Sequence, residues 1–264
     1  MLRLSGKGVR KALELMAEGY HRIQDLPDSH IGSTLNERQR RALRQRGIVV
    51  EPGLAAALES LEPPLGFLDF ETVGRAVPVW EGLAPWGQIP AQFSYHERQP
   101  DGSIRHAAWL GDGPGDPRRE LALRLVEATR GARTIVVYTS FEATQLRSLA
   151  AALPDLAPQI EDISHHLFDL HRVIKEYVYH PDFRGSFSLK DVLPVLVPGL
   201  SWNDIAIQDG GTASAEIAHL MLRSGDLDAS AKRQLREELL AYCEQDTLAL
   251  LRLLESLERL ARAG

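Results

Sequence analysis

The chain has 264 residues, a length that suits one large domain or one domain with an appended segment. Apolar residues make up 44% and charged residues 25%, which is typical of a globular protein, and no apolar run approaches the ~20 residues needed to span a membrane. The 30 Lys plus Arg against 36 Asp plus Glu give a net charge of −6, which argues against a protein that coats nucleic acid by bulk charge. A nuclease is still compatible with this charge, because bound divalent ions can carry the local positive charge.

The cysteine content and the first residues bear on the cellular compartment. A single cysteine, Cys243, excludes an internal disulfide bond and a multi-cysteine zinc or iron–sulfur site within this chain. The start, Met-Leu-Arg-Leu-Ser-Gly-Lys, lacks the apolar stretch and the cleavage site of a secretory signal. We therefore expect a reducing, cytoplasmic setting and no membrane partner.

Residues 1–62 are predicted to be a helical N-terminal extension to a domain over residues 63–264. Apolar spacing and turn residues predict helices over 9–20, 34–46 and 53–61. The second of them opens with a capping-box pattern, Thr34 with Glu37 three residues on. It also carries five arginines: Arg38, Arg40, Arg41, Arg44 and Arg46. These arginines indicate either a solvated helix face or an arm that contacts phosphates.

The segment Gly-Phe-Leu-Asp-Phe-Glu-Thr at residues 66–72 is typical of a short buried strand. Side chains two positions apart on a strand share a face, so Asp69 and Glu71 aim at one spot near the carboxyl end of this strand. Open α/β sheets bind ligands at that end, and carboxylate oxygens suit Mg²⁺ or Mn²⁺. The alternative is a strand end that reaches solvent with two exposed acids.

The loop after this strand, residues 73–90, is rich in Gly and Pro and contains Trp80 and Trp86. A long loop inside a compact domain is usually functional or disordered. Its tryptophans either stack on a base or pin the loop to the core.

The remaining patterns complete a sheet of five strands. Further strands are predicted over 92–98, 104–110, 134–138 and, more weakly, 163–170. The turn Pro100-Asp101-Gly102 joins two of them as a hairpin, so the first three strands form an antiparallel meander. A right-handed crossover lays the fourth strand parallel to one strand of the meander, and the first strand is the economical choice. Helices are predicted over 116–131, 141–153, 187–197, 213–222 and 230–262. The predicted fold class is α/β, with a mixed five-stranded sheet of three antiparallel and two parallel strands flanked by helices.

Two further acids are candidates for the same site. Glu142 lies in the first turn of the helix after the fourth strand, where the helix dipole alone also favours an acid by under about 1 kcal/mol. Asp246 lies on the apolar stripe of the last helix, and Tyr242 precedes it by four residues on the same face. An acid and a tyrosine on a core-facing stripe indicate site residues, and the alternative is a buried Asp–Tyr hydrogen bond.

Three motifs resemble those of the DEDD 3′–5′ exonucleases, which have a ribonuclease H-like fold. They are Leu68-Asp69-Phe70-Glu71-Thr72, Ser140-Phe141-Glu142 and Tyr242-Cys243-Glu244-Gln245-Asp246. The spacing of Tyr242 and Asp246 is similar to the tyrosine branch, since the histidine branch has His one position earlier, where this chain has Ala241. Phe168-Asp169-Leu170 and Ser188-Leu189-Lys190 also resemble segments of these enzymes. The resemblance extends from about residue 64 to the end, and more narrowly the chain is similar to a bacterial domain family with an L-D-F-E-T signature.

The resemblance implies a two-metal phosphodiesterase that shortens single-stranded DNA or RNA from the 3′ end. Its metal ligands are Asp69, Glu71, Glu142 and Asp246, which hold two Mg²⁺ or Mn²⁺ ions ~4 Å apart across the scissile phosphate. Glu71 and Tyr242 orient the attacking water, since a phenol with an ordinary pKa near 10 is a poor base. The implied substrate-binding residues are Phe70, Thr72 and Lys190, with Phe70 or a loop tryptophan stacked on the terminal base.

One residue departs from the pattern, because the second motif normally supplies Asp where this chain has Glu142. An extra methylene moves the carboxylate by roughly a bond length, so the site is either altered or weakened, and Asp169 is a fallback ligand. Two other functions therefore stay open. One is a catalytically weakened or inactive module that binds nucleic acid or a protein partner, and the other is a hydrolase of small nucleotides.

Overall fold

The structure is a computed structural model that describes residues 9–203 and 205–263. The expectation of no secretory signal concerns residues 1–7, which lie outside the described residues. The described chain folds into two compact units, each made of segments far apart in the sequence. The sheet unit comprises Leu61–Asp169 and Ser201–Arg252, and the helical unit comprises the described parts of Met1–Ser60, Leu170–Leu200 and Leu253–Gly264. The limits of these units differ from the predicted boundary between residues 62 and 63. The division into an N-terminal extension and one domain stays a prediction.

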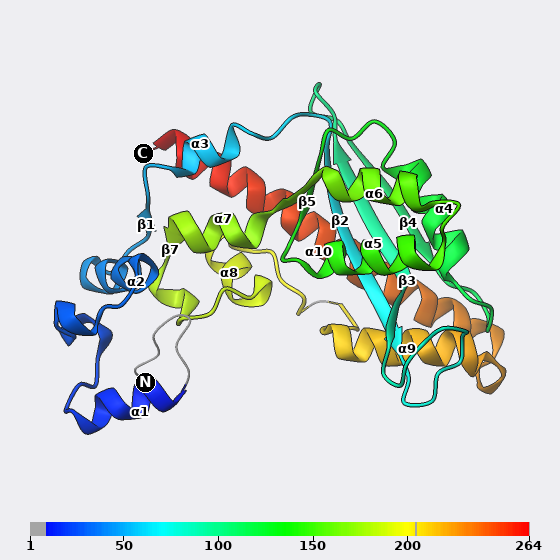
Figure 1. Ribbon diagram of the computed structural model, residues 1–264, viewed down its shortest axis with the longest axis horizontal. Helices are drawn as coiled ribbons and strands as arrows, with labels where there is room; N and C mark the ends of the chain where they lie inside the picture. The colour runs from blue at the N-terminus through cyan, green and yellow to red at the C-terminus, as the bar shows by residue number, and fades with distance from the viewer. Residues whose placement is uncertain (1–8, 204, 264) are drawn as a thin grey trace. The chain divides into compact units, whose positions relative to one another are not determined.

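The sheet unit contains one mixed sheet with the strand order β4-β3-β2-β5-β6. Its strands are β2 (Leu65–Gly74), β3 (Gln88–Arg98), β4 (Ile104–Leu110), β5 (Thr134–Val137) and β6 (Leu167–Asp169). The first three are antiparallel neighbours (Figure 1). Strand β5 pairs parallel with β2, and β6 pairs parallel with β5. The predicted α/β fold class, with three antiparallel and two parallel strands flanked by helices, is confirmed.

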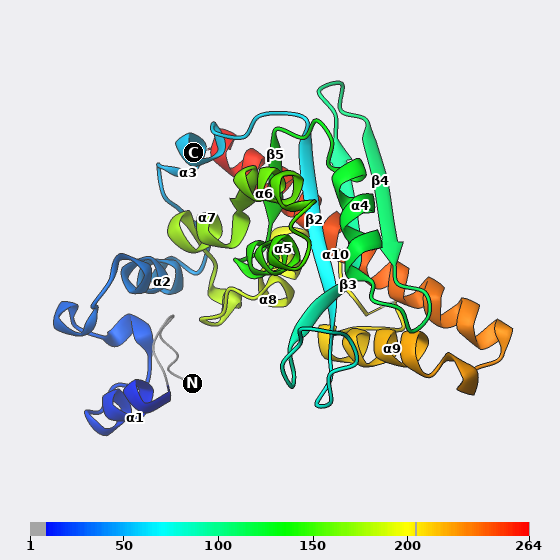
Figure 2. The same cartoon turned by 45° about the vertical axis from the view of Figure 1, so that its right-hand side comes forward.

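The two faces of the sheet differ in character because side chains alternate along each strand. Leu68 and Phe70 of β2 belong to an apolar core with helices α4 (Arg118–Ala128), α5 (Phe141–Ala152) and α6 (Ala157–His165). The opposite face carries polar side chains and packs on α10 (Ala229–Ala263) through its residues up to 252: Gln92 donates to the Leu239 carbonyl, and Ser94 bonds Thr247. Figures 1 and 2 show the three helices on one face and this part of α10 on the other. Asp69 and Glu71 therefore lie on the polar face.

Helix α9 (Gly210–Leu222) packs against β2 in the sheet unit, and the short 3-10 helix η4 (Ser224–Asp226) follows it. The fifth strand is shorter than predicted. Residues 157–165 form α6, whose buried Ile160 and Ile163 have the three-residue spacing of a helix, so the prediction of a strand from residue 163 was wrong. The loop between β2 and β3 is also shorter than predicted, at residues 75–87, because both strands extend into it.

The helical unit is built mostly from short elements. It contains α1 (Val9–Ala17), α2 (Thr34–Gln45), α3 (Leu54–Leu58), α7 (Leu170–Tyr177), α8 (Leu189–Leu196) and the 3-10 helices η1 (Ile23–Asp25), η2 (Asp28–His30) and η3 (Pro181–Phe183). Strands β1 (Val49–Val50) and β7 (Val178–Tyr179) pair antiparallel. Sequence patterns missed α7 and this two-residue ladder, which is too short to show a period. The cap of α2 is Ser33, which accepts a hydrogen bond from the Asn36 backbone, and not Thr34 as predicted.

The arginines of α2 form neither a uniformly solvated helix face nor an arm of free side chains for contacting phosphates. Arg38 and Arg40 are buried. Arg38 donates to Glu51 and to the Lys175 carbonyl, and Arg40 binds Asp28 and the Leu26 carbonyl. Arg41 pairs with Glu51, and Arg44 donates to the Gln24 carbonyl. These side chains hold the segments of the helical unit together.

None of the helices in the described part of the chain combines the length and the apolar character that crossing a membrane requires.

Candidate metal centre

The carboxyl end of β2 brings two acids to the polar face of the sheet. Asp69 and Glu71 lie two positions apart, and the strand register shifts between Glu71 and Thr72, as at a β-bulge. Bulges re-aim side chains and are frequent beside active sites. Glu71 is buried and Asp69 is partly buried, so the alternative of two solvent-exposed acids is wrong.

Helix α10 adds the third acid from a position far along the chain. Carboxylate oxygens of Asp69, Glu71 and Asp246 all lie within 4.8 Å of one another. Asp246 is also buried, and the indole Nε1 of Trp202 donates to its Oδ1 at 2.8 Å. Trp202 therefore fixes the direction of this carboxylate. Sequence reasoning missed Trp202, since it lies in a loop without periodicity, 44 positions before its partner.

Glu142 reaches Asp69 from the first turn of α5. Its side chain is 2% exposed, and its Oε2 has no hydrogen-bond partner within the described structure. Burial raises its pKa to about 8, and the charge of Asp169 adds to this, while a hydrogen bond with Asp69 acts in the opposite direction. A buried carboxyl oxygen without a partner is costly, so this position favours either a bound proton or a cation.

The turn before Glu142 holds an unusual backbone conformation. Thr139 has a φ of 85°, which is rare for a β-branched residue. Its amide donates to Asp169 Oδ1 at 3.3 Å, and its hydroxyl accepts from the Phe141 amide. The turn thus places Asp169 of β6 close to the start of α5. Strain of this kind tends to occur at functional sites, where the surrounding structure maintains it.

The clustered carboxyls shift one another's protonation. The pKa of Asp69 is raised well above its ordinary value by burial first, and then by the charges of Asp246, Glu71 and Glu142. Like charges this close cannot all ionise without compensation, so a metal-free site must retain protons. Divalent cations would displace those protons and supply the missing counter-charge.

Tyr242 lies beside the acids as a neutral donor. Its side chain is buried, and its pKa is raised by burial and by the charges of Asp246, Glu71 and Asp69. The phenol therefore stays protonated and can donate a hydrogen bond, whereas its role in orienting the attacking water stays a prediction. The neighbouring Cys243 lies with its Sγ 3.7 Å from Asp69 Oδ2, and burial raises the pKa of its thiol.

The N-terminus of α9 also borders the acids. A side-chain atom added at Gly210 would lie 3.7 Å from Glu71 Oε2. Asp209 caps this helix by accepting from the Thr212 amide at 2.9 Å. The N-terminal end of a helix dipole is positive, so the start of α9 has a polarity that suits the acidic group beside it. The sequence predicted a helix here only from residue 213.

The predicted substrate-binding residues lie in different places. Phe70 is 2% exposed and packs in the apolar core, so its ring cannot stack on a base, and the predicted stacking role of Phe70 was wrong. Thr72 is buried just after the register shift. Lys190 belongs to α8 of the helical unit, whereas the four candidate acids belong to the sheet unit.

The two loop tryptophans separate into two roles. Trp80 is buried, and its Nε1 donates to the Pro114 carbonyl at 3.0 Å, so it pins the loop to the sheet unit. Trp86 is 71% exposed, on the loop that follows the acids of β2. The interpretation that a tryptophan pins the loop is confirmed for Trp80, and stacking on a base stays a prediction for Trp86.

Comparisons with known proteins give one similarity. Residues 66–188 match the model of a family described as a domain of unknown function (DUF2779). The matched range includes Asp69, Glu71 and Glu142 and ends before Tyr242 and Asp246. No curated protein and no solved structure matches the chain.

Proposed function

We propose that the protein is a metal-dependent 3′–5′ exonuclease that hydrolyses phosphodiester bonds of single-stranded DNA or RNA with two Mg²⁺ or Mn²⁺ ions. The observation that carries the proposal is the convergence of Asp69, Glu71 and Asp246 within 4.8 Å, with Glu142 beside Asp69. These acids come from three elements, and the resemblance to the DEDD exonucleases rests on the same residues. The single cysteine supports a cytoplasmic location as part of this proposal.

The residues present fit two hard divalent ions. All four donors are carboxylates, the ligand type that Mg²⁺ and Mn²⁺ prefer. The unpartnered Oε2 of Glu142 and the raised pKa of Asp69 indicate charge that the protein itself leaves uncompensated. Asp169 lies near Glu142 and is the fallback ligand if the longer glutamate side chain directs its oxygen away from an ion.

Bound ions of this type activate a water nucleophile and stabilise the charge on the leaving oxygen. The chain's own residues supply position. Trp202 holds the Asp246 carboxylate in one orientation, and Tyr242 offers a phenol proton as a hydrogen-bond donor to the water or to a phosphate oxygen. Glu71 remains the acceptor that can orient the attacking water.

The loop at residues 75–87 is the proposed contact for the substrate's bases. Its exposed apolar side chains, Val77, Val79 and Trp86, line a hollow together with Arg75. An indole with one open face can stack on a base of any identity, and an arginine can pair with the phosphate backbone. This arrangement suits binding of a single strand without sequence preference.

The test is release of nucleotides from single-stranded DNA and RNA in the presence of Mn²⁺. A substrate labelled at its 5′ end should shorten stepwise, and the variants Asp69→Asn and Asp246→Asn should lose this activity. The matched control is Asp155→Asn, which removes an exposed acid paired with Arg119. Activity that survives in either site variant, or wild-type protein that is inactive with both Mn²⁺ and Mg²⁺, would refute the proposal.

The second candidate is a non-catalytic module that binds nucleic acid or a protein partner. It is favoured by Glu142, which stands where the exonucleases have Asp and is buried with one oxygen unpartnered. Calorimetry separates the two candidates. Binding of two Mn²⁺ ions that Asp69→Asn removes supports the enzyme, and wild-type protein that binds no Mn²⁺ supports the module.

A further inference from the structure

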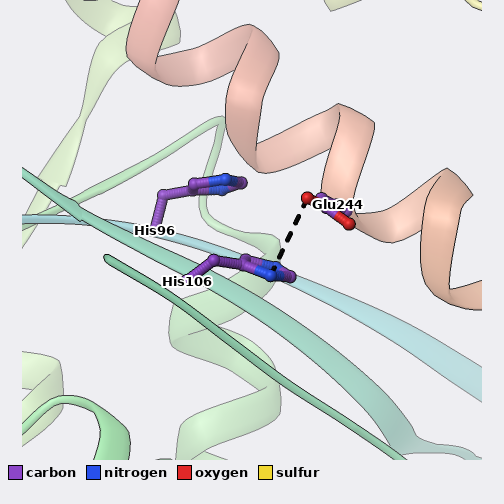
Figure 3. Close-up of side chains that lie close together, drawn as sticks. All are labelled: His96, His106 and Glu244. Carbon is purple, nitrogen blue, oxygen red and sulfur yellow. Dashed lines mark ion pairs between the residues drawn. The ribbon is translucent and has the colours of Figure 1, made fainter. Parts of the chain in front are cut away.

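A second group of potential metal ligands lies on the polar face of the sheet. It consists of His96 on β3, His106 on β4 and Glu244 on α10, and Figure 3 shows the two rings and the carboxylate directed towards a common space. The two histidines are direct cross-strand partners, with ring centroids 4.4 Å apart. One ligand atom from each of the three residues lies within 4.8 Å of the other two.

Hydroxyl groups hold one nitrogen of each imidazole. His96 Nδ1 lies 2.8 Å from Thr247 Oγ1, and His106 Nε2 lies 2.9 Å from Ser94 Oγ. The two hydroxyls lie 2.8 Å from each other, and Thr247 donates to the Glu244 backbone carbonyl at 3.1 Å. All of these groups belong to the sheet unit.

One arrangement of protons satisfies every member of this network. When Thr247 donates its single hydrogen to the Glu244 carbonyl, which can only accept, Ser94 donates to Thr247. Both imidazoles then donate to the hydroxyls, His96 through Nδ1–H and His106 through Nε2–H. The remaining nitrogens, His96 Nε2 and His106 Nδ1, present lone pairs, and His106 Nδ1 lies 3.8 Å from Glu244 Oε1.

We propose that His96 Nε2, His106 Nδ1 and a Glu244 oxygen form a binding site for a transition-metal ion of the Zn²⁺ class. Two imidazoles and one carboxylate are a ligand set that such ions favour and that Mg²⁺ does not. Each histidine also has the second hydrogen bond that orients metal-binding imidazoles, here supplied by Ser94 and Thr247. The site is separate from the carboxylate cluster in residues and in ligand chemistry, so it goes beyond the proposed nuclease function.

Binding an ion requires the three side chains to draw together. Tetrahedral zinc with bonds of about 2.0–2.1 Å places ligand atoms roughly 3.4 Å apart. His106 Nδ1 and Glu244 Oε1 lie 3.8 Å apart, and the ligand atoms of the group all lie within 4.8 Å of one another. His96 is buried, whereas His106 and Glu244 are exposed, so an ion can enter from solvent and Glu244 can rotate to meet it. Three protein ligands leave a fourth position for water. A bound ion would tie the β3–β4 hairpin to α10, the helix that carries Tyr242 and Asp246.

Charge at the group is compatible with a cation at neutral pH. Burial, with smaller contributions from the charges of His106 and Arg252, lowers the pKa of His96 to about 4. Burial also lowers the pKa of His106, while the charge of Glu244 raises it. Both imidazoles are therefore neutral near pH 7, the form that ligates metals.

The test is titration of the full chain with ZnCl₂ by calorimetry, in excess Mg²⁺ so that the carboxylate cluster is occupied by a hard ion. We expect His106→Ala and Glu244→Gln each to weaken Zn²⁺ binding by roughly tenfold or more, and Ser94→Ala to weaken it about 10- to 100-fold by releasing the His106 tautomer. Matched controls are His165→Ala on α6 and Glu237→Gln on α10, both exposed residues outside the group, which should bind Zn²⁺ as the wild type does.

Two results would overturn the site: wild-type protein that binds no Zn²⁺, or equal affinities in the wild type and in both His106→Ala and Glu244→Gln. Replacing Zn²⁺ with Co²⁺ gives an independent readout, because imidazole ligation intensifies its visible absorption, and His106→Ala should abolish that band. His106 and Glu244 are exposed, so their variants should keep the wild-type circular dichroism spectrum. None of these readouts depends on nuclease activity, so the second site and the proposed function can fail separately.

Discussion

Replacing Glu142 with glutamine is expected to stabilise the metal-free protein while it removes part of the metal centre. The carboxyl is 2% exposed and has one oxygen without a partner. Glutamine keeps the shape of the side chain and has no charge to desolvate. The stability gained should therefore equal the free energy that the wild type loses because Glu142 ionises more readily in the unfolded chain than in the native protein.

The raised pKa sets the sign and size of this effect. The folded-state pKa is about 8 against an ordinary 4.5, so the native state binds the proton more tightly than the unfolded chain does. The stability that the protonated carboxyl contributes is fully present below pH 4.5 and is lost as the pH rises from 4.5 to about 8. One pKa unit corresponds to about 1.4 kcal/mol, which gives a loss of about 3 kcal/mol at neutral pH and at most about 5 kcal/mol in alkali.

Urea unfolding in EDTA, across that pH range, measures the effect. The free energy of unfolding of Glu142→Gln should exceed that of the wild type by an amount that grows with pH and levels off above about pH 8. Adding Mn²⁺ should reverse the order, because ligands that bind only the native state stabilise it. The matched control, Glu161→Gln, removes an exposed acid of α6 and should follow the wild-type profile. Parallel pH profiles for the wild type and Glu142→Gln would refute the reasoning.

Three further predictions test single contacts. Trp202→Phe removes the donor to Asp246 but keeps an apolar ring, so calorimetry should show Mn²⁺ affinity reduced about 10- to 100-fold; unchanged affinity would show that the indole does not orient the carboxylate. Trp86→Ala should weaken oligonucleotide binding by about 1–3 kcal/mol, measured by fluorescence anisotropy, and equal affinity would exclude stacking on this residue. Arg40→Ala should lower the free energy of unfolding by about 1–3 kcal/mol, because it leaves the Leu26 carbonyl without its donor. The control Arg46→Ala, at an exposed position, should change the free energy of unfolding little. Similar losses in the two variants would contradict the structural role of Arg40.

Local patterns predicted the parts of the fold and site that depend on short-range periodicity. The two-residue repeat of β2 indicated that Asp69 and Glu71 share a face, and the apolar stripe of α10 placed Asp246 and Tyr242 toward the core. The pairing of β5 with β2 followed from the preference for right-handed crossovers together with the choice of the first strand as the most economical partner. Phe70 could have been assigned to the other face by the same repeat, because it lies between the two acids and must point away from them.

Contacts between distant segments left no comparable signal. Trp202 donates to Asp246, and Gly210 borders Glu71, from a connection in which no short-range pattern predicts either contact. The arginines of α2 had the composition of a solvated face, and only the tertiary structure shows that Arg38 and Arg40 bind carbonyls and acids of other segments. Propensity describes a helix in isolation, whereas these side chains are placed by the segments that pack around them.

The second site combines a contact that the sequence pattern could predict with contacts that only tertiary packing creates. The hairpin turn at residues 99–103 sets the register, which places His96 opposite His106. This pairing could have been predicted from the sequence, since both residues lie the same number of positions from the turn. The third ligand and the hydroxyls could not, because Glu244 and Thr247 reach the pair only when α10 packs on the polar face of the sheet. A helix that buries Thr247 against Ser94 and His96 must provide partners for their polar atoms, and this packing, rather than any motif, groups the two imidazoles with Glu244.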